Sequence, residues 1–380
     1  MGERRRLSRR EFLKLGAAFA GAMLIPVSGC RPGPGSELDQ FIRARMEAAH
    51  LPGLAACVVG DGRVVWANGY GWANVEKQVA VTPDTLFMLA SVSKTITSVA
   101  LMQLYDDGLF GLDDDVDDYL PFSTRNPRHP ATPITPRMLL THTSSLADNW
   151  DVIEPLYTPG DSPIPLGDFC AGYVTPGGEY YTAENFHARP PGQVCDYCNV
   201  GVALGGYLAQ VLSGVPFEQH CEQRLFAPLG MEETSWRLAG LDAAHIATPY
   251  TYDDGQYTPY EHYGYPDYPD GALRTSVLQL ARFLITFING GAYGDTRILQ
   301  ASTVAEMRRE QVPALEEGQG LIWYTEGERM GHDGGDDGIL TRMFFRPTNG
   351  RGVILLSNGE GDTGDDALLE IENRLFEMEW

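Results

Sequence analysis

The hexapeptide Leu89-Ala90-Ser91-Val92-Ser93-Lys94 opens a segment that we expect to be helical as far as about Asp106. In a helix, Ser91 and Lys94 lie one turn apart on the same face, with roughly 5–6 Å between their Cβ atoms. A serine becomes a nucleophile when a neighbouring base takes its proton, and a lysine can be that base if burial and nearby positive dipoles lower its pKa. The N–H groups of the first turn also favour a developing oxyanion. The spacing predicts a nucleophile with its base, although two fixed residues are a weak signal alone.

Lysine usage strengthens this interpretation. The chain has only three lysines, Lys14, Lys77 and Lys94, against 25 arginines. Arginine does not give up its proton in a protein, whereas lysine can. A chain that almost always uses arginine but keeps lysine at position 94 is therefore more consistent with a base there than with an exposed helical lysine.

Two further motifs carry polar groups suited to the same chemistry. Tyr197 and Asn199 are two residues apart, before a helical run over 200–212, and in an extended segment they point the same way. A phenolate beside a cation can act as a general base, and an asparagine can bond both a lysine and a substrate amide. The segment 331–335, Gly-His-Asp-Gly-Gly, precedes a predicted strand, and its glycines allow a substrate backbone to come close. Each motif alone would more often be structural.

Together the three motifs resemble the serine β-lactamase and penicillin-binding-protein superfamily, in its class C-like, D-peptidase and esterase branch. That branch carries S-x-x-K, Y-x-N and K/H-x-G in this chain order. Three more stretches, 108–121, 139–146 and 270–283, are similar to its other conserved blocks, and the resemblance runs from about residue 37 to 380.

The resemblance implies a role for each matching residue. Ser91 is the acylating nucleophile and Lys94 its proton acceptor. Tyr197 passes the proton to the leaving group and later activates the deacylating water, while Asn199 orients the substrate amide. The implied substrate is a small peptide, an ester or a β-lactam, and no cofactor is implied.

The third motif departs from the usual pattern. His332 stands where the β-lactamases usually have a lysine, and Gly334 and Gly335 follow it; the N–H groups of Ser91 and Gly335 would form the oxyanion hole. Because a histidine is mostly neutral near pH 7, it holds a β-lactam carboxylate less well than lysine. We therefore expect a D-peptidase, carboxypeptidase or esterase rather than an efficient β-lactamase. A non-catalytic cell-wall binding or scaffold protein on the same fold is the alternative of another class.

Two other departures are a cysteine and a serine in the conserved blocks. Cys198 replaces the usual serine between Tyr and Asn, and Ser145 replaces the usual glycine of the His-Thr-Ser-Gly block, which could alter a turn there. The Tyr-rich segment 250–268 holds seven tyrosines. It could rim the cleft, or it could be an ordinary ordered surface loop.

The hydrophobic pattern predicts an α+β fold. Helical periodicity covers 36–50 and 365–380, apolar runs at 54–60 and 64–69 flank a Gly-Asp-Gly turn, and further strands are expected at 320–325, 341–346 and 352–357. The economical arrangement is one antiparallel sheet built from both ends of the chain and flanked by the terminal helices, as in the β-lactamase/transpeptidase-like fold. An α/β lobe of about 37–90 and 272–380 would then carry a mostly helical lobe of about 91–271.

The first residues read as an export signal rather than as part of the fold. Paired arginines precede a 13-residue apolar run over 15–27, too short for a membrane span of roughly 20 residues. The segment 1–29 resembles a twin-arginine signal peptide whose end resembles a lipobox. Cys30 would then be lipidated and 30–36 would be a tether, giving an exported periplasmic or cell-envelope lipoprotein held to a membrane by its lipid. A plain signal peptide is the alternative.

Composition excludes several partners. The formal net charge is −23 and the pI is about 4.6, so nucleic acid is not an expected partner. No metal-ligand spacing is present, and we expect no metal and no other cofactor. The C-x-x-C of Cys195 and Cys198 is expected to form one or two structural bridges with Cys170 or Cys221, whereas Cys57 is expected to be a buried free thiol.

Overall fold

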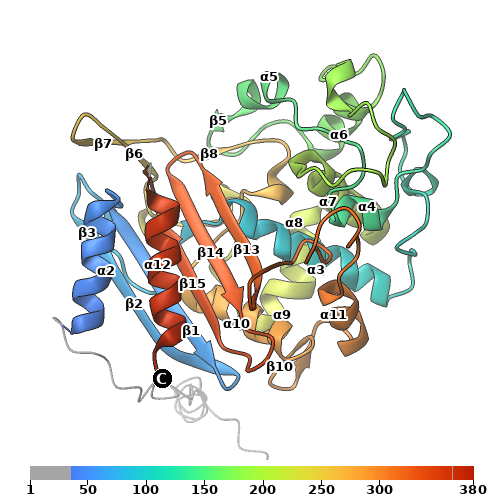
Figure 1. Ribbon diagram of the computed structural model, residues 1–380. Helices are drawn as coiled ribbons and strands as arrows, with labels where there is room; N and C mark the ends of the chain where they lie inside the picture. The colour runs from blue at the N-terminus through green and yellow to red at the C-terminus, as the bar shows by residue number, and fades with distance from the viewer. Residues whose placement is uncertain (1–35, 362) are drawn as a thin grey trace, which may run out of the picture. The chain divides into compact units, whose positions relative to one another are not determined.

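The computed structural model describes residues 36–361 and 363–380, whose helices and strands carry the labels of Figure 1. The predicted signal segment 1–29, the predicted lipidation site Cys30 and the tether as far as residue 35 lie outside the described residues. No single helix in the described part is long and apolar enough to cross a membrane; only the bent pair Asn199–Ser213 and Phe217–Leu229 passes that test together.

A seven-stranded antiparallel sheet joins the two ends of the described chain (Figure 1), in the order β12-β13-β14-β15-β1-β2-β3. β1 pairs with β15, with Cys57 opposite Ile354. The sheet predicted from both ends of the sequence is therefore confirmed. Its strands are β1 (Gly53–Gly60), β2 (Arg63–Asn74), β3 (Val79–Ala80), β12 (Tyr324–Glu326), β13 (Arg329–Asp336), β14 (Ile339–Phe345) and β15 (Gly352–Ser357).

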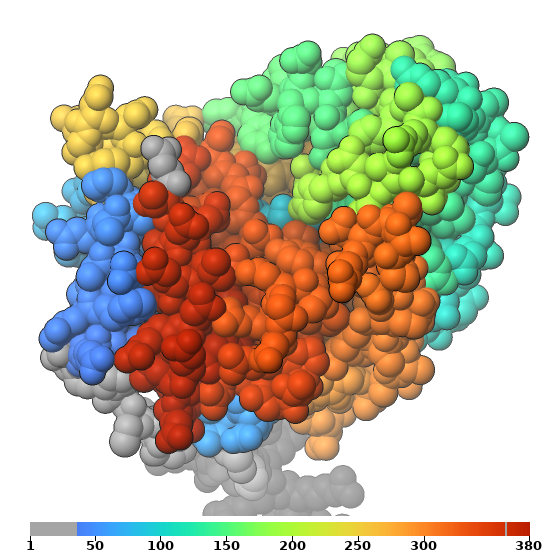
Figure 2. Space-filling model, in the orientation of Figure 1, coloured from blue at the N-terminus to red at the C-terminus, as the bar shows by residue number. Residues whose placement is uncertain are grey.

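Both faces of the sheet are covered, so the interior strand β1 is buried on each side. The terminal helices α2 (Glu37–Ala48) and α12 (Gly364–Glu377) lie side by side over one face, blue and red in Figure 2. Leu54 and its alternate neighbours pack with these helices, whereas Cys57 and its alternate neighbours pack on the other side, where α10 (Val277–Ile288) lies. The two-residue alternation of a strand produces this division.

The rest of the chain supplies helices and short strands around α3 (Ser93–Asp106) and α7 (Asn199–Ser213), which pack against each other. The other helices are α4 (Pro136–Leu140), α5 (Trp150–Ile153), α6 (Leu166–Val174), α8 (Phe217–Cys221), α9 (Ala227–Leu229) and α11 (Ala301–Arg308). The short strands are β4 (Phe87–Met88), β5 (Thr158–Pro159), β6 (Tyr250–Asp253), β7 (Gln256–Pro259), β8 (Tyr263–Gly264), β9 (Arg274–Thr275), β10 (Ala292–Tyr293), β11 (Thr296–Arg297) and β16 (Gly359–Glu360).

Near the C-terminus, one strand prediction is corrected and one strand was not predicted. The expected strand over 320–325 is wrong for its first half, because Ile322 adopts φ 71° and the Gly320 amide bonds the Trp323 carbonyl at 2.9 Å, which makes a tight buried turn before β12. The segment 331–335 precedes β14, as expected, but it is itself part of β13, a strand that the sequence analysis did not predict. Its glycines lower the strand propensity of the sequence, which hides the strand.

The disulfide prediction is wrong. All five cysteines of the described residues are free thiols. The Cys195 thiol donates to the Thr141 carbonyl at 3.4 Å and the Cys198 thiol to Asp148 at 3.3 Å, so each has a partner other than sulfur. Cys57 is a fully buried free thiol, as predicted.

Candidate active site

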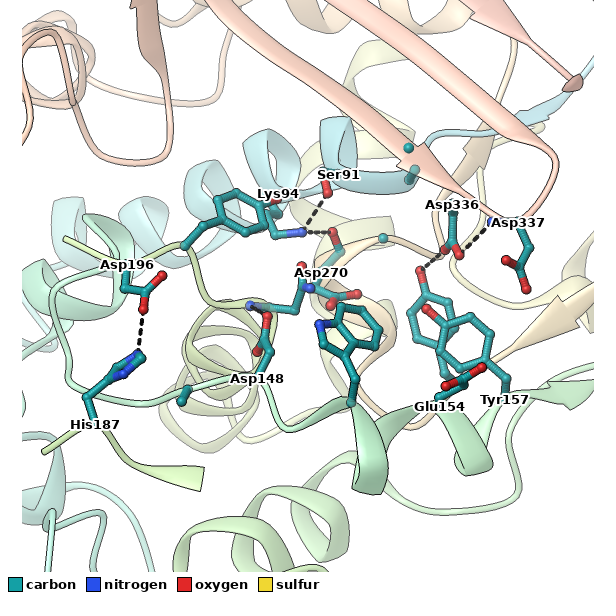
Figure 3. Close-up of a pocket in the computed structure, with 18 residues that line it drawn as sticks. Ser91, Lys94, Asp148, Glu154, Tyr157, His187, Asp196, Asp270, Asp336 and Asp337 are labelled. Atoms are coloured by element: carbon teal, nitrogen blue, oxygen red, sulfur yellow. Dashed lines mark hydrogen bonds and ion pairs between the residues drawn. The ribbon is translucent and has the colours of Figure 1, made fainter. Parts of the chain in front are cut away.

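Ser91 lies at a sharp turn between a strand and a helix. It belongs to a short 3-10 helix, η2 (Ala90–Val92), that follows β4 and leads directly into α3. Ala90 adopts φ 45°, a left-handed conformation that costs a non-glycine residue roughly 1–2 kcal/mol. Strained backbone of this kind is held by its surroundings and is common at functional sites. Here it presents Ser91, half-buried, to a cavity (Figure 3).

Lys94 extends toward the serine from the first turn of α3. Its Nζ donates to Ser91 Oγ at 2.9 Å and to the Asp270 carbonyl oxygen at 2.9 Å, and the side chain is 1% exposed (Figure 3). Burial lowers the pKa of Lys94, but interaction with the ionised forms of Tyr197 and Asp270 outweighs burial, and the pKa is raised overall. The expected lowering is therefore reversed: in the resting site Lys94 is an ammonium group that donates to Ser91.

The aromatic ring of Tyr197 lies next to the amine of Lys94. The Lys94 Nζ lies 5.0 Å from the centroid of the Tyr197 ring, which is 45% exposed on the cavity wall. Burial around its hydroxyl raises the pKa of Tyr197, while the charge of Lys94 and hydrogen bonding to Lys94 and Ser91 oppose that rise. Ser91, Lys94 and Tyr197 thus form one hydrogen-bonded cluster, so the structure brings together three residues that the sequence analysis had singled out.

His142 supports Tyr197, and sequence reasoning gave it no role. Its ring lies 4.5 Å from the Tyr197 ring, and its Nδ1 accepts a hydrogen bond from the Cys198 amide at 3.2 Å. Burial and the positive charge of Lys94 lower the pKa of His142 to about 3, so the ring is neutral. The signal was present, because His142 belongs to the 139–146 block that the sequence analysis had noted.

Asp148 fixes the start of α7, where Asn199 is located. Its carboxylate accepts from the amides of Asn199 at 2.8 Å and Val200 at 3.0 Å, and from the Cys198 thiol. The Cys198 sulfur in turn accepts from the Gly201 amide at 3.3 Å, so Cys198 is the N-cap residue of α7. The family resemblance implies a serine at this position. A carboxylate at a helix N-terminus satisfies free N–H groups and the helix dipole, and this one orients Asn199 at the cavity.

Replacing Asp148 with alanine is expected to destabilise the protein by about 1–2 kcal/mol, the usual loss for a helix cap. The amides of Asn199 and Val200 lose their acceptor, and Asn199 loses its anchor. Urea unfolding measures the change, with the exposed Asp295→Ala as the control. Equal stability of the two variants would contradict this account of Asp148.

The third motif lies on β13, beside Ser91. A Cβ on Gly334 would come within 2.8 Å of both the Ser91 amide nitrogen and the Leu89 carbonyl oxygen, so only glycine fits there. His332 is 2% exposed, and its Nδ1 lies 2.5 Å from the Asp333 carbonyl oxygen. Burial lowers the pKa of His332 to about 4, in line with the expectation of a neutral ring. Gly335 reaches the cavity next to Ser91.

Two cavities meet at the serine. The larger, about 830 Å³, extends toward α5 and the end of β13, and the smaller, about 370 Å³, toward His332 and β12. Ser91, Tyr197 and Gly335 line both. A substrate can therefore lie across Ser91 with one part in each cavity. The Tyr-rich segment contributes Tyr265 to the larger cavity.

No group of three or more His, Cys, Asp or Glu side chains in the described part of the chain is arranged to hold a metal ion. The polar groups around Ser91 are instead those of acyl transfer: a hydroxyl, an amine, a phenol and an amide.

The family model called Beta-lactamase matches residues 38–376. The chain belongs to the beta-lactamase family. Penicillin-binding protein 4 of Amycolatopsis lactamdurans is 27% identical to this family member over 347 residues, which cover 84% of each chain. Protein flp of Staphylococcus aureus strain N315 is 23% identical, and the match covers 85% of this chain but 62% of protein flp.

Solved structures of other proteins share this beta-lactamase fold. The octameric penicillin-binding protein homologue from Pyrococcus abyssi matches with a TM-score of 0.73 and 26% identity, over 89% of this chain and 76% of that chain. A penicillin binding protein from Bacillus halodurans matches with a TM-score of 0.69 and 22% identity, over 88% and 98% of the two chains. The predicted β-lactamase/transpeptidase-like fold is confirmed, and the chain is a member of a serine hydrolase superfamily.

Ser145 stands where the family resemblance implies a glycine. Ser145 adopts φ 67°, the left-handed region that favours glycine. Its hydroxyl accepts from the Asn126 amide at 2.5 Å and donates to the Arg189 carbonyl at 2.9 Å. The backbone there retains a glycine-like conformation, and two hydrogen bonds offset its strain.

Proposed function

We propose that the protein is a serine hydrolase that forms a covalent acyl-enzyme with an amide or ester, with D-peptidase, carboxypeptidase or esterase activity. The observation that carries the proposal is the 2.9 Å contact between Lys94 Nζ and Ser91 Oγ, in a cavity that the Tyr197 ring also lines. Nucleophile and proton carrier lie within hydrogen-bond distance, as covalent catalysis requires.

In the proposed reaction, Ser91 Oγ attacks the substrate carbonyl carbon and its proton passes to the Lys94–Tyr197 pair. The carbonyl oxygen takes the negative charge, with the amides of Ser91 and Gly335 as donors. The bond to the leaving group then breaks, and the leaving group takes a proton from Tyr197. A water molecule next attacks the acyl carbon, gives its proton to Tyr197 and releases Ser91, which regains its own proton.

This reaction needs the Lys94–Tyr197 pair to carry one proton fewer than in its fully protonated form. Because the pKa of each group is raised, the competent form becomes more populated as pH rises. Activity is therefore expected to increase with pH on the alkaline side of neutrality.

A neutral His332 disfavours β-lactams, because the site then lacks a fixed charge for a β-lactam carboxylate. His332→Lys is expected to raise the rate at which a fluorescent penicillin acylates the protein by about tenfold, since a hydrogen bond between charged groups contributes about 1.4 kcal/mol or more. Gel-based labelling over time measures the rate, and the neutral His332→Gln is the control. A rate no higher than that of the unchanged protein would contradict this role for His332.

A substrate panel tests the proposed function. Residues 37–380 would be assayed with p-nitrophenyl esters, D-Ala-D-Ala peptides and nitrocefin, and Ser91→Ala would serve as the blank. Turnover that Ser91→Ala abolishes supports the hydrolase. Ligand binding that survives Ser91→Ala, with no product burst from activated esters, would instead support a non-catalytic cell-wall binding or scaffold protein. Nitrocefin as the best substrate would favour a β-lactamase.

We also propose that the chain is exported and anchored to a membrane of the cell envelope through Cys30. The support is the sequence alone: paired arginines, a short apolar run and, shortly after that run, Cys30. Several buried acyl chains give stable anchoring, so Cys30→Ala is expected to move the protein from the membrane pellet to the soluble fraction of a bacterial host. The same distribution for both proteins would contradict the anchor.

A further inference from the structure

The smaller of the two cavities at Ser91, about 370 Å³, is lined by buried polar side chains. Neither an arginine nor a lysine is among the described residues that line it, since Lys94 lines the larger cavity instead. Three of its polar side chains are almost fully buried: His332 is 2% exposed, His142 5% and Gln319 6%. The hydrogen bonds that these three make within the protein determine what each can offer to a bound molecule.

His332 offers an acceptor. Its Nδ1 lies 2.5 Å from the Asp333 carbonyl oxygen, and a carbonyl oxygen only accepts, so Nδ1 carries the ring proton. Burial lowers the pKa of His332 to about 4, so the ring is neutral near pH 7 and its other nitrogen, Nε2, has a lone pair and no proton. No hydrogen bond joins Nε2 to any described residue, and this nitrogen is therefore free to accept from a ligand.

Gln319 offers a second acceptor, by the same reasoning. Its Nε2 donates to the Gly320 carbonyl at 2.8 Å, which fixes the orientation of the side-chain amide and leaves Oε1 as an acceptor. Within the described part of the chain, Oε1 has no hydrogen-bond partner. Asp333 adds a carboxylate at the edge of the cavity, where its side chain is 47% exposed and accepts from the Tyr324 hydroxyl at 2.7 Å. This side of the cavity thus suits a group that donates.

His142 offers the complementary donor. Its Nδ1 accepts from the Cys198 amide at 3.2 Å, so Nδ1 carries no proton, and the single proton of the neutral ring is on Nε2. Nothing in the described residues accepts a hydrogen bond from this Nε2. The rings of His142 and His332 lie 4.5 Å and 6.1 Å, centroid to centroid, from the same Tyr197 ring. A free donor and a free acceptor are therefore near each other in one small cavity.

A ligand that satisfies these three atoms must both donate and accept. A carboxylate only accepts, and it would lie against two acceptors and near the charge of Asp333. An ammonium group only donates, so the Nε2–H of His142 would remain unpaired. An amide has a carbonyl oxygen that accepts and N–H groups that donate, and it carries no charge. Because an unpaired buried polar group costs binding free energy, this arrangement favours an amide over either charged group.

We propose that the smaller cavity binds an uncharged amide of the substrate, either a carboxamide or a peptide bond with its N–H, beside the bond that is cleaved. His142 donates to the carbonyl oxygen of that amide. His332 accepts from its N–H, and Gln319 accepts from the second N–H of a primary amide. This inference rests on the proposed hydrolase function and deepens it, because it selects substrates that continue as an amide at this point over substrates that end there in a carboxylate.

Two matched series of substrates test the inference. In the first, the variable group lies beyond the scissile bond, in N-acetyl-D-alanylglycine, its carboxamide and its N,N-dimethylamide. In the second it lies on the acyl part, in the p-nitroanilides of succinic acid, of its monoamide and of its N,N-dimethyl monoamide. In the series whose variable group reaches the smaller cavity, we expect kcat/KM to be at least about tenfold higher for the carboxamide than for both analogues. No such preference in either series would overturn the inference.

Variants of His332 locate the effect. His332→Phe keeps a ring but removes the acceptor, and it is expected to lower the ratio of carboxamide to dimethylamide kcat/KM by about tenfold. His332→Lys replaces the acceptor with a charged donor, and it is expected to make the carboxylate a better substrate than the carboxamide. His245 is exposed and lines neither cavity, so His245→Phe is the matched control and should keep the original order. A ratio in His332→Phe equal to that of the control would overturn the assignment.

Binding without chemistry separates this inference from the proposed function. Calorimetric titration of Ser91→Ala with the carboxamide and the carboxylate of each series is expected to show tighter binding of the carboxamide in at least one series. If a fluorophosphonate labels Ser91 in the unchanged protein but neither carboxamide has an advantage, the inference fails and the hydrolase stands. If a carboxamide binds better but no reagent labels Ser91, the hydrolase fails, and with it the claim that the bound amide belongs to a substrate.

Discussion

Lys94→Arg is expected to slow acylation of Ser91 by ~10²–10⁴-fold, the usual contribution of a positioned acid or base. Arginine keeps the positive charge but does not release its proton, so the variant separates charge from proton transfer. The larger guanidinium must also fit a position that is 1% exposed and bonded to Ser91 and Asp270. Stopped-flow release of p-nitrophenol from an activated ester measures the acylation rate.

Lys77 provides the control for that experiment. It is the other lysine after residue 29, and it is exposed beside β3, away from the cavity. Lys77→Arg is expected to acylate at the rate of the unchanged protein. An acylation rate for Lys94→Arg within a few-fold of the rate for Lys77→Arg would mean that Lys94 contributes charge alone, and another group would have to receive the serine proton.

Tyr197→Phe is expected to reduce turnover by a similar ~10²–10⁴-fold. The substitution keeps the ring that contacts His142 and Lys94 but removes the hydroxyl. Because the phenol serves both steps in the proposed reaction, the leaving group and the deacylating water each lose their proton carrier. Steady-state hydrolysis of esters and anilides measures the loss, and it should be larger for the anilide, whose leaving group needs the proton more.

Tyr257→Phe is the matched control, since Tyr257 lies on β7 outside both cavities. Equal losses for ester and anilide in Tyr197→Phe would contradict a role in protonating the leaving group. Thermal unfolding of both variants shows whether loss of structure explains any change.

The parts of the fold that the sequence predicted are those with strong local patterns. The run 54–60 and the turn after it predicted the first hairpin, and the apolar run 352–357 matched β15. β13 was missed because three of its eight residues are glycines, whose presence follows from the close approach of β13 to Ser91 rather than from strand propensity. β13 is therefore determined by a tertiary contact, and a local sequence pattern does not reveal such a contact.

The candidate site likewise contains residues that the sequence predicted and residues that it did not. Ser91 and Lys94 were predictable because helix geometry fixes their spacing. Asp148 and Asp270 were not, since their roles depend on contacts with residues 50 and 176 positions away in the chain. The raised pKa of Lys94 has the same origin, because Tyr197 and Asp270, the groups that raise it, are distant from Lys94 in the sequence.

The most direct test of the central claim is covalent labelling of Ser91. The folded protein would be treated with a fluorophosphonate and mapped by peptide mass spectrometry, beside Ser91→Ala and Lys94→Arg. The account predicts one adduct on the peptide that contains Ser91, absent from Ser91→Ala and formed far more slowly in Lys94→Arg. A folded protein with no adduct, or an adduct that persists in Ser91→Ala, would contradict it.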